Sequence, residues 1–172
     1  MKKNINRNFF RGIMFHFFHD NKKHLKAQGS ISKKQFLRVI SKIGRRNILD
    51  PEEFYIRYKK KTLRKNNVCL TFDDCLKSQY DIALPILQKK KIKAFFFIYS
   101  STLTNKPDLF ELYRYFRINY FKNIDVFYNE FFSFIEQKKL KKFFFNQKKK
   151  INLWKENYKY YSLNDIKFRI IR

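Results

Sequence analysis

Two adjacent acidic residues, Asp73 and Asp74, offer the clearest chemistry in the sequence, because they directly follow the short apolar run 68–72. Two carboxylates at the end of a buried strand are costly to keep ionised, since each raises the proton affinity of the other and burial adds to that cost. A bound cation would relieve it. Neighbouring residues that leave a strand point to opposite sides, so we expect one carboxylate to hold a metal while the other takes a proton from water. The alternative is an Asx-turn or a helix cap, which are common where Asp follows a strand.

Strands and helices alternate around this acidic pair, which predicts an α/β fold with parallel strands. Apolar runs of strand length occupy residues 9–18, 68–72 and 94–99, and the last run is continuous enough to be buried on both faces. Between the first two runs, the sequence predicts a helix over 32–43, with the spacing of a capping box at its start, and a second helix that begins at Asp50-Pro51.

The rest of the chain reads as helical. Ser78 is expected to cap a helix that leads to the third strand, and amphipathic helices are expected over 107–120 and 124–137. Ser162 has the pattern of one more helix start, and the sequence ends barely two turns later. We therefore predict one domain over residues 1–172 that is incomplete at its C-terminus.

The net charge of +26, from 40 Lys and Arg against 14 Asp and Glu, would attract nucleic acid, anionic lipid or acidic polysaccharide. The lysine-rich segment 138–150, with aromatic residues at 143–145, is interpreted first as a solvated helix face, with a basic loop and a nucleic-acid contact through stacking aromatics as the alternatives. However, the residue types in surplus are those that AT-rich codons produce, so we weigh compositional drift above binding. A basic nucleic-acid or anionic-surface binding module is the alternative function. Three glycines exclude a Gly-rich phosphate loop.

Cysteine usage and hydropathy bear on the compartment. Cys69 and Cys75 follow no secretory leader, so we expect free thiols in a reducing, cytoplasmic setting. The longest apolar run, 94–99, is too short to cross a bilayer, and no membrane span is expected. Nothing in the sequence indicates an oligomeric state.

The acidic pair and its surroundings resemble the NodB-type polysaccharide deacetylase family. Residues 71–75 follow the family's first motif, Thr-Phe-Asp-Asp-Gly, except that Cys75 stands at the glycine position. The stretch 81–87 is similar to the family's next helix, which ends in a Leu-Pro-Ile-Leu type of sequence, and residues 94–97 are similar to its next strand. Phe15-His16 also looks like the aromatic-His pair near the start of many family members.

This resemblance implies a (β/α) barrel, of which the chain would form the N-terminal part, and metal-assisted removal of an acetyl group from an N-acetylated carbohydrate. In the matching positions, Asp73 would be the general base and Asp74 a metal ligand. We expect His16 to contact the substrate, with plain packing in its loop as the alternative. The implied cofactor is a divalent cation, zinc or a similar ion.

Two departures from the family pattern matter. Cys75 puts a side chain where a loop can require positive φ. The family's His-x-x-x-His ligands are absent, since no histidine follows His24, a residue that we expect at the surface. We therefore expect incomplete metal coordination and an inactive isolated chain, either a fragment of a deacetylase or a degenerate remnant. Supply of the missing nitrogens by His16 and His19 is a further alternative, although their spacing is poor for a strand.

Overall fold

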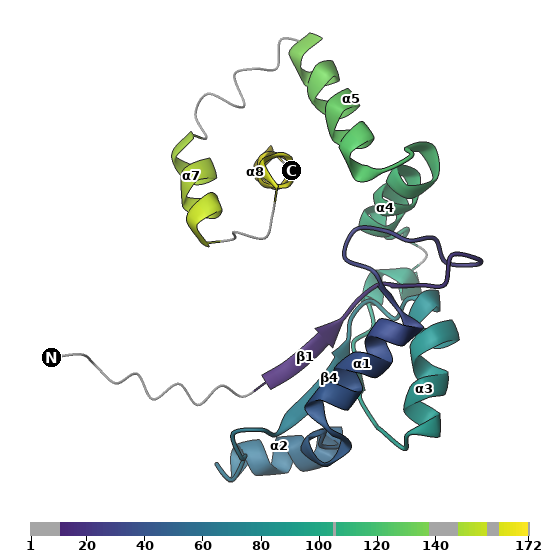
Figure 1. The fold of residues 1–172 in the computed structure, drawn as a ribbon, viewed down its shortest axis with the longest axis vertical. Coiled ribbons are helices and arrows are strands. Elements are labelled where there is room, and N and C mark those ends of the chain that lie inside the picture. Colours follow the sequence, from purple (N-terminus) through teal and green to yellow (C-terminus); the bar gives the residue numbers. More distant parts are fainter. Residues whose placement is uncertain (1–10, 105, 138–147, 158–161, 172) are drawn as a thin grey trace, which may run out of the picture. The chain divides into compact units, whose positions relative to one another are not determined.

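The computed structural model describes residues 11–104, 106–137, 148–157 and 162–171 (Figure 1). The chain divides into two compact units, Met1–Asp108 and Leu109–Arg172. The first unit contains the strands and has the predicted α/β class, whereas the described part of the second unit is helical. That these units make a single domain, incomplete at its C-terminus, stays a prediction.

A three-stranded parallel sheet forms the centre of the first unit, in the order β1-β4-β5. Its strands are β1 (Arg11–Phe15), β4 (Val68–Phe72) and β5 (Phe95–Phe96), and a separate parallel pair consists of β2 (Phe18–His19) and β3 (Ile31–Ser32). The prediction of a strand over 94–99 buried on both faces was wrong: only two residues pair, and residues 96–99 are exposed. In the described part of the chain β5 pairs with β4 alone, so no strand pairs with its outer edge. The sheet is open there, and a closed barrel stays a prediction.

Three α-helices accompany this sheet, α1 (Lys33–Ile43), α2 (Pro51–Lys59) and α3 (Leu84–Lys89). The predicted capping box of α1 is confirmed, because the Gln35 amide N–H donates to Ser32 Oγ and the Ser32 N–H donates to Gln35 Oε1. The helix ends at Gly44, whose φ of 80° favours glycine.

Shorter helical turns fill the connections, at Arg45–Asn47 and Ser100–Thr104 (3-10) and at Gln79–Ala83 (π). The expectation that Ser78 caps a helix was wrong. Helical structure already begins at Lys77, so Ser78 lies inside the turn and is buried, and its Oγ accepts a hydrogen bond from the Phe18 N–H, 3.4 Å away. Pro85 lies at the start of α3, directly after the π turn Gln79–Ala83.

Four phenylalanines hold the sheet against α1. Phe15 stacks on Phe72 with ring centroids 5.4 Å apart, and Phe36 meets Phe15 edge to face at 4.9 Å. Phe18 contacts both Phe36 and Phe72. Because all four rings are buried, this cluster fixes the ends of β1 and β4 relative to each other.

The second unit contains α4 (Leu109–Tyr120), α5 (Ile124–Gln137), α7 (Lys148–Asn157) and α8 (Leu163–Ile171). The bounds of α5 are those predicted, and Ser162 caps α8 as expected, accepting from the Asp165 N–H at 3.1 Å. The buried Tyr128 hydroxyl donates to Asp165 at 2.6 Å and so ties α5 to α8. Most of the lysine-rich segment 138–150 lies outside the described residues, so binding of nucleic acid there stays a prediction.

None of the helices among the described residues has the length and apolar character that crossing a membrane requires.

Candidate functional site

His16, Asp73 and Asp74 come together at the carboxyl edge of the sheet. Phe15 and Phe72 are register partners at the ends of β1 and β4, and the Asp73 N–H donates to the Phe15 carbonyl at 3.2 Å. The residues that follow these partners, His16 and Asp73, therefore leave the sheet side by side. This edge is where parallel α/β proteins place their active sites.

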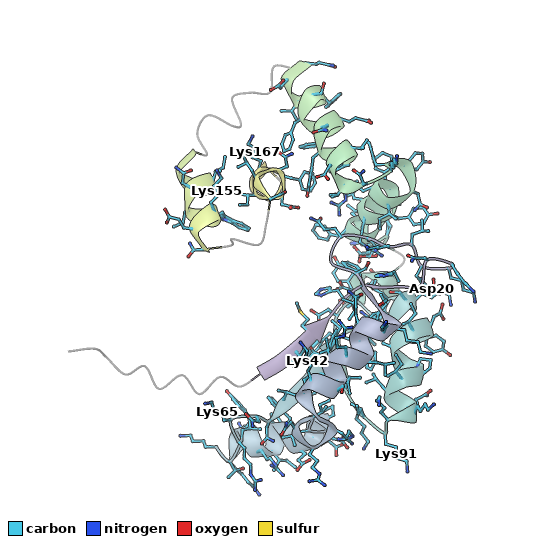
Figure 2. All side chains as sticks on the ribbon, in the orientation of Figure 1. Asp20, Lys42, Lys65, Lys91, Lys155 and Lys167 are labelled. Atoms are coloured by element: carbon cyan, nitrogen blue, oxygen red, sulfur yellow. The ribbon has the colours of Figure 1, made fainter. Side chains whose placement is uncertain are left out.

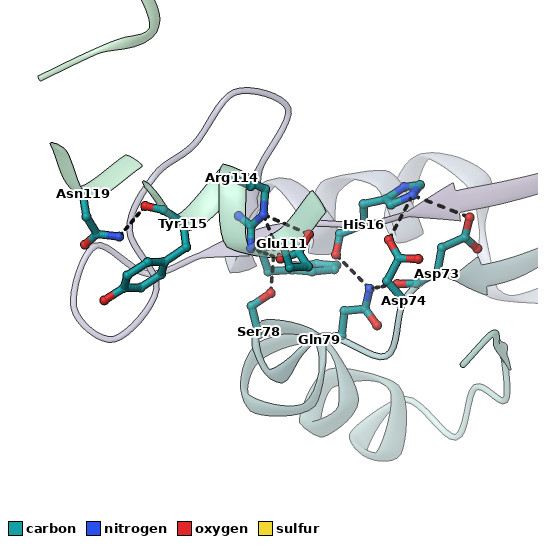
Figure 3. A network of polar contacts seen from close by, with 10 residues as sticks. His16, Asp73, Asp74, Ser78, Gln79, Glu111, Arg114, Tyr115 and Asn119 are labelled. Atoms are coloured by element: carbon teal, nitrogen blue, oxygen red, sulfur yellow. Dashed lines mark hydrogen bonds and ion pairs between the residues drawn. The ribbon is translucent and has the colours of Figure 1, made fainter. Parts of the chain in front are cut away.

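The two carboxylates face the same imidazole nitrogen. His16 Nε2 lies 3.6 Å from Asp73 Oδ2 and 3.7 Å from Asp74 Oδ2 (Figure 3). The expectation that the carboxylates point to opposite sides was wrong, because the chain turns sharply at Asp74, where φ is 70°. All three side chains are about one-third exposed, at 33%, 28% and 34%, so water and a small ligand can reach them. We call His16, Asp73 and Asp74 the acidic cluster.

The turn that aims Asp74 continues through Cys75, whose φ is 51°. Positive φ is costly for a residue other than glycine, although Asp tolerates it better than most. The positive φ expected at the family's glycine position is thus present in this chain, and a cysteine adopts it. Cys75 is exposed and has a free thiol.

Gln79 joins the two strand ends that support the acidic cluster. Its Nε2 donates to the His16 carbonyl at 2.9 Å and to the Asp73 carbonyl at 2.6 Å (Figure 3). Carbonyl oxygens only accept, so the nitrogen of the amide must face them. The side chain is 1% exposed, and among the described residues its Oε1 has no hydrogen-bond donor. Sequence reasoning missed Gln79, and the available signal was its place on the buried face of the helix, three residues before Ile82.

His19 lies apart from this chemistry. It is buried, and its Nδ1 is 2.8 Å from Ser30 Oγ, which holds the loop that follows β2. Within the described ranges, no three His, Cys, Asp or Glu side chains are grouped so that they could hold a metal ion. The alternative in which His16 and His19 complete a metal site is therefore wrong for the part of the chain that the structure describes.

His24 is not the plain surface residue that we expected. Its Nε2 lies 2.9 Å from Asp81 Oδ2, and its side chain is only 16% exposed. This hydrogen bond lowers the pKa of Asp81, and a weaker contribution comes from Lys77 Nζ at 3.3 Å. The bond joins the loop after β2 to the π turn that carries Gln79. The sequence could not predict it, because 57 residues separate the partners.

Two other groups of the first unit, one in the loop after β2 and one in β4, also have shifted pKa values. The backbone N–H groups of His24 and Lys22 donate to Asp20 and lower the pKa of its carboxyl group. Burial inside β4 raises the pKa of the Cys69 thiol to about 11, so that thiol is protonated and inert at neutral pH. Cys69 and Cys75 are both free.

The donor set of the acidic cluster suits a divalent cation in kind, since imidazole and carboxylate groups are ordinary zinc ligands. It falls short in number and arrangement, because the described residues contain no group of three that could hold an ion. The residues at hand do not make a complete site for the metal that the resemblance implies.

Comparison with known proteins bears on the same region. Residues 60–123 match the family model described as polysaccharide deacetylase. A solved structure of a de-N-acetylase from Aggregatibacter actinomycetemcomitans resembles the chain with a TM-score of 0.45 and 21% identity, over 56% of this chain. The chain covers 40% of the length of that structure. No curated protein matches the chain significantly.

The family match contains the whole run from Leu70 to Phe97 on which the resemblance rests, including Asp73 and Asp74. The resemblance of this chain to the NodB-type polysaccharide deacetylase family is therefore confirmed over residues 60–123.

Proposed function

We propose that the chain supplies the acidic part of a carbohydrate N-deacetylase site, which hydrolyses the amide of an N-acetylated sugar to acetate and an amine. The observation that carries this proposal is the convergence of Asp73 and Asp74 on His16 at the carboxyl edge of the sheet, beside a segment that matches polysaccharide deacetylases. The family match supports the substrate class and the reaction, a hydrolysis of a carbon–nitrogen bond that is not a peptide bond.

In this proposal Asp73 is the general base. Its carboxylate takes a proton from the water that attacks the acetyl carbonyl, and that proton is available for the nitrogen that leaves. One-third exposure leaves room for this water. His16 contacts the substrate, because its imidazole nitrogen lies beside the two carboxylates and its side chain is partly exposed.

Asp74 is the residue that would ligate a divalent cation, with zinc as the first candidate. Such an ion, when bound, polarises an amide carbonyl and acidifies water. The remaining ligands have to come from outside the described residues, and this need agrees with the absence of any histidine beyond His24. We therefore propose that the chain acts as part of a longer or composite deacetylase, and that it is inactive when isolated.

Zinc titration by calorimetry tests this proposal on the chain itself. We expect weak, saturable binding of one zinc ion, which Asp74→Asn abolishes. Asp125→Asn is the matched control, since it removes one exposed carboxylate from α5 and should leave binding unchanged. Binding that survives Asp74→Asn, or no saturable binding at all, would contradict the assignment of Asp74.

Acetate release from oligomers of N-acetylglucosamine tests the role of Asp73. The isolated chain should release no acetate, and any activity gained by fusion to a segment that supplies a His-x-x-x-His motif should disappear in Asp73→Asn and persist in Asp125→Asn. Activity that persists without the Asp73 carboxylate would exclude it as the general base.

A further inference from the structure

A groove lined by arginines lies at the opposite end of β4 from the acidic cluster. It has a volume of about 670 Å³, and its walls are the 3-10 turn Arg45–Asn47, the helix α2 and the loop 64–67. Asn67 directly precedes β4 and Asp73 directly follows it, so the five-residue strand separates the two sites by roughly 17 Å. The proposed deacetylase chemistry uses none of these residues. We call this feature the arginine groove.

The lining of the groove differs in composition from the chain as a whole. The chain contains 11 arginines and 29 lysines. Four arginines and one lysine line the groove: Arg45, Arg46, Arg57, Arg64 and Lys65. Codon bias accounts for a general surplus of lysine, but it does not gather arginines in one place. Arginine is the side chain whose planar fork matches a phosphate group with paired hydrogen bonds.

Most of this positive charge is uncompensated. Glu53 is the carboxylate in the lining, and it pairs with Arg57 Nη2 at 2.5 Å. Arg46, Arg64 and Lys65 are exposed, and no ion pair engages them among the residues that the structure describes. Five cations therefore face one anion. Figure 2 shows Lys65 next to α2, at this end of the first unit.

Hydrogen bonds to neutral groups hold the walls in place. Arg45 donates to the carbonyls of Ile48 at 2.9 Å and Lys91 at 2.6 Å, so its position is fixed while its charge stays available. The buried Asn67 accepts from the Arg64 N–H at 2.8 Å, with Arg57 Nη1 3.5 Å from the same oxygen. The bonds of Asn67 join α2 to the loop before β4, and those of Arg45 join the 3-10 turn to Lys91, just after α3.

We propose that the arginine groove binds a compact ligand that carries a phosphate ester or pyrophosphate group. An excess of several positive charges calls for a ligand with at least two negative charges, which a carboxylate alone does not supply. The volume of the groove falls within the range of about 300–1,000 Å³ that is typical of small-molecule sites. A long nucleic-acid strand would instead need a basic path that continues beyond the groove.

Calorimetric titration of the whole chain with pyrophosphate at 0.15 M salt tests the proposal. The double variant Arg46→Gln/Arg64→Gln should weaken binding about tenfold, because it removes two of the exposed cations that attract the ligand. The matched control, Arg38→Gln/Lys42→Gln, removes two exposed cations from α1 and should leave affinity unchanged.

Glu53→Gln should strengthen binding, an effect that damage to the fold would not produce. It removes the competing carboxylate and frees Arg57, so pyrophosphate should bind about threefold more tightly. Asp73→Asn should have no effect, which separates this site from the proposed deacetylase site.

Three results would overturn the proposal. These are no saturable binding of pyrophosphate, equal loss of affinity in the groove variant and the α1 control, and weaker binding in Glu53→Gln. A single-stranded oligonucleotide that binds more tightly than pyrophosphate, and loses affinity in the same double variant, would assign the groove to nucleic acid and overturn it as well.

Discussion

Replacement of Cys75 by glycine should stabilise the first unit, although it removes a side chain from the loop beside the acidic cluster. Cys75 has a φ of 51°, in the region where a Cβ atom crowds the backbone. The side chain is exposed and its thiol is free, so its loss costs no burial. The substitution therefore isolates the conformational cost of this one position.

The expected gain is a difference between two opposing effects. Left-handed backbone costs a residue with a Cβ about 1–2 kcal/mol, and glycine avoids this cost. Glycine also makes the unfolded chain more flexible, which costs about 0.4–1 kcal/mol. The net stabilisation should be about 0.5–1 kcal/mol. With a urea dependence of about 2 kcal/mol per molar, the midpoint should rise by about 0.3–0.5 M.

Urea unfolding followed by far-ultraviolet circular dichroism measures this midpoint. Cys75→Ser is the matched control, because it removes the thiol and keeps the Cβ atom, and its midpoint should equal that of the original chain. A Cys75→Gly midpoint at or below that of Cys75→Ser would refute the reasoning, since it would mean that the loop does not hold Cys75 at positive φ.

Three other predictions concern the support of the site. Gln79→Leu should destabilise the first unit by about 1–3 kcal/mol, because the carbonyls of His16 and Asp73 lose the amide donor that they share, and the amide of Asp73 should exchange its hydrogen faster; unchanged stability and exchange would exclude the bridging role. One thiol per native chain, that of Cys75, should react with Ellman's reagent at pH 8, and Cys69 should react only after unfolding; rapid reaction of both would contradict the burial of Cys69. The pKa of Asp81 is lowered in the folded state, so its contribution to stability is complete above its ordinary pKa of 3.8 and is lost as the pH falls through the lowered value. Asp81→Asn should therefore flatten the acid limb of the stability profile, and an unaltered limb would show that His24 does not stabilise the charged form.

The elements that local signals determine could be predicted from the sequence. Ser32 and Gln35 lie within one helical turn of each other, so their spacing alone predicts the start of α1. The class of the fold and the place of Asp73 at the end of a strand follow from short apolar runs in the same way. The prediction of a buried strand over 94–99 was wrong, because an apolar run does not reveal whether a neighbouring strand is present to cover it.

Contacts between distant residues could not be predicted. The approach of both carboxylates to His16 depends on the register of β1 with β4 and on a backbone turn at Asp74. The role of Gln79 depends on two carbonyls that come from different strands. The arginine groove likewise forms from residues that share no motif, and only the fold brings them to one place.

Zinc titration observed at the three histidine rings tests the acidic cluster most directly. Ring signals of His16, His19 and His24 can be followed together by nuclear magnetic resonance, and the last two serve as internal controls because Ser30 and Asp81 engage them. We expect zinc to move the His16 signals alone, and Asp74→Asn to prevent the movement. Zinc that moves the signals of His19 or His24 instead, or leaves His16 unaffected, would contradict a cation-binding acidic pair beside His16.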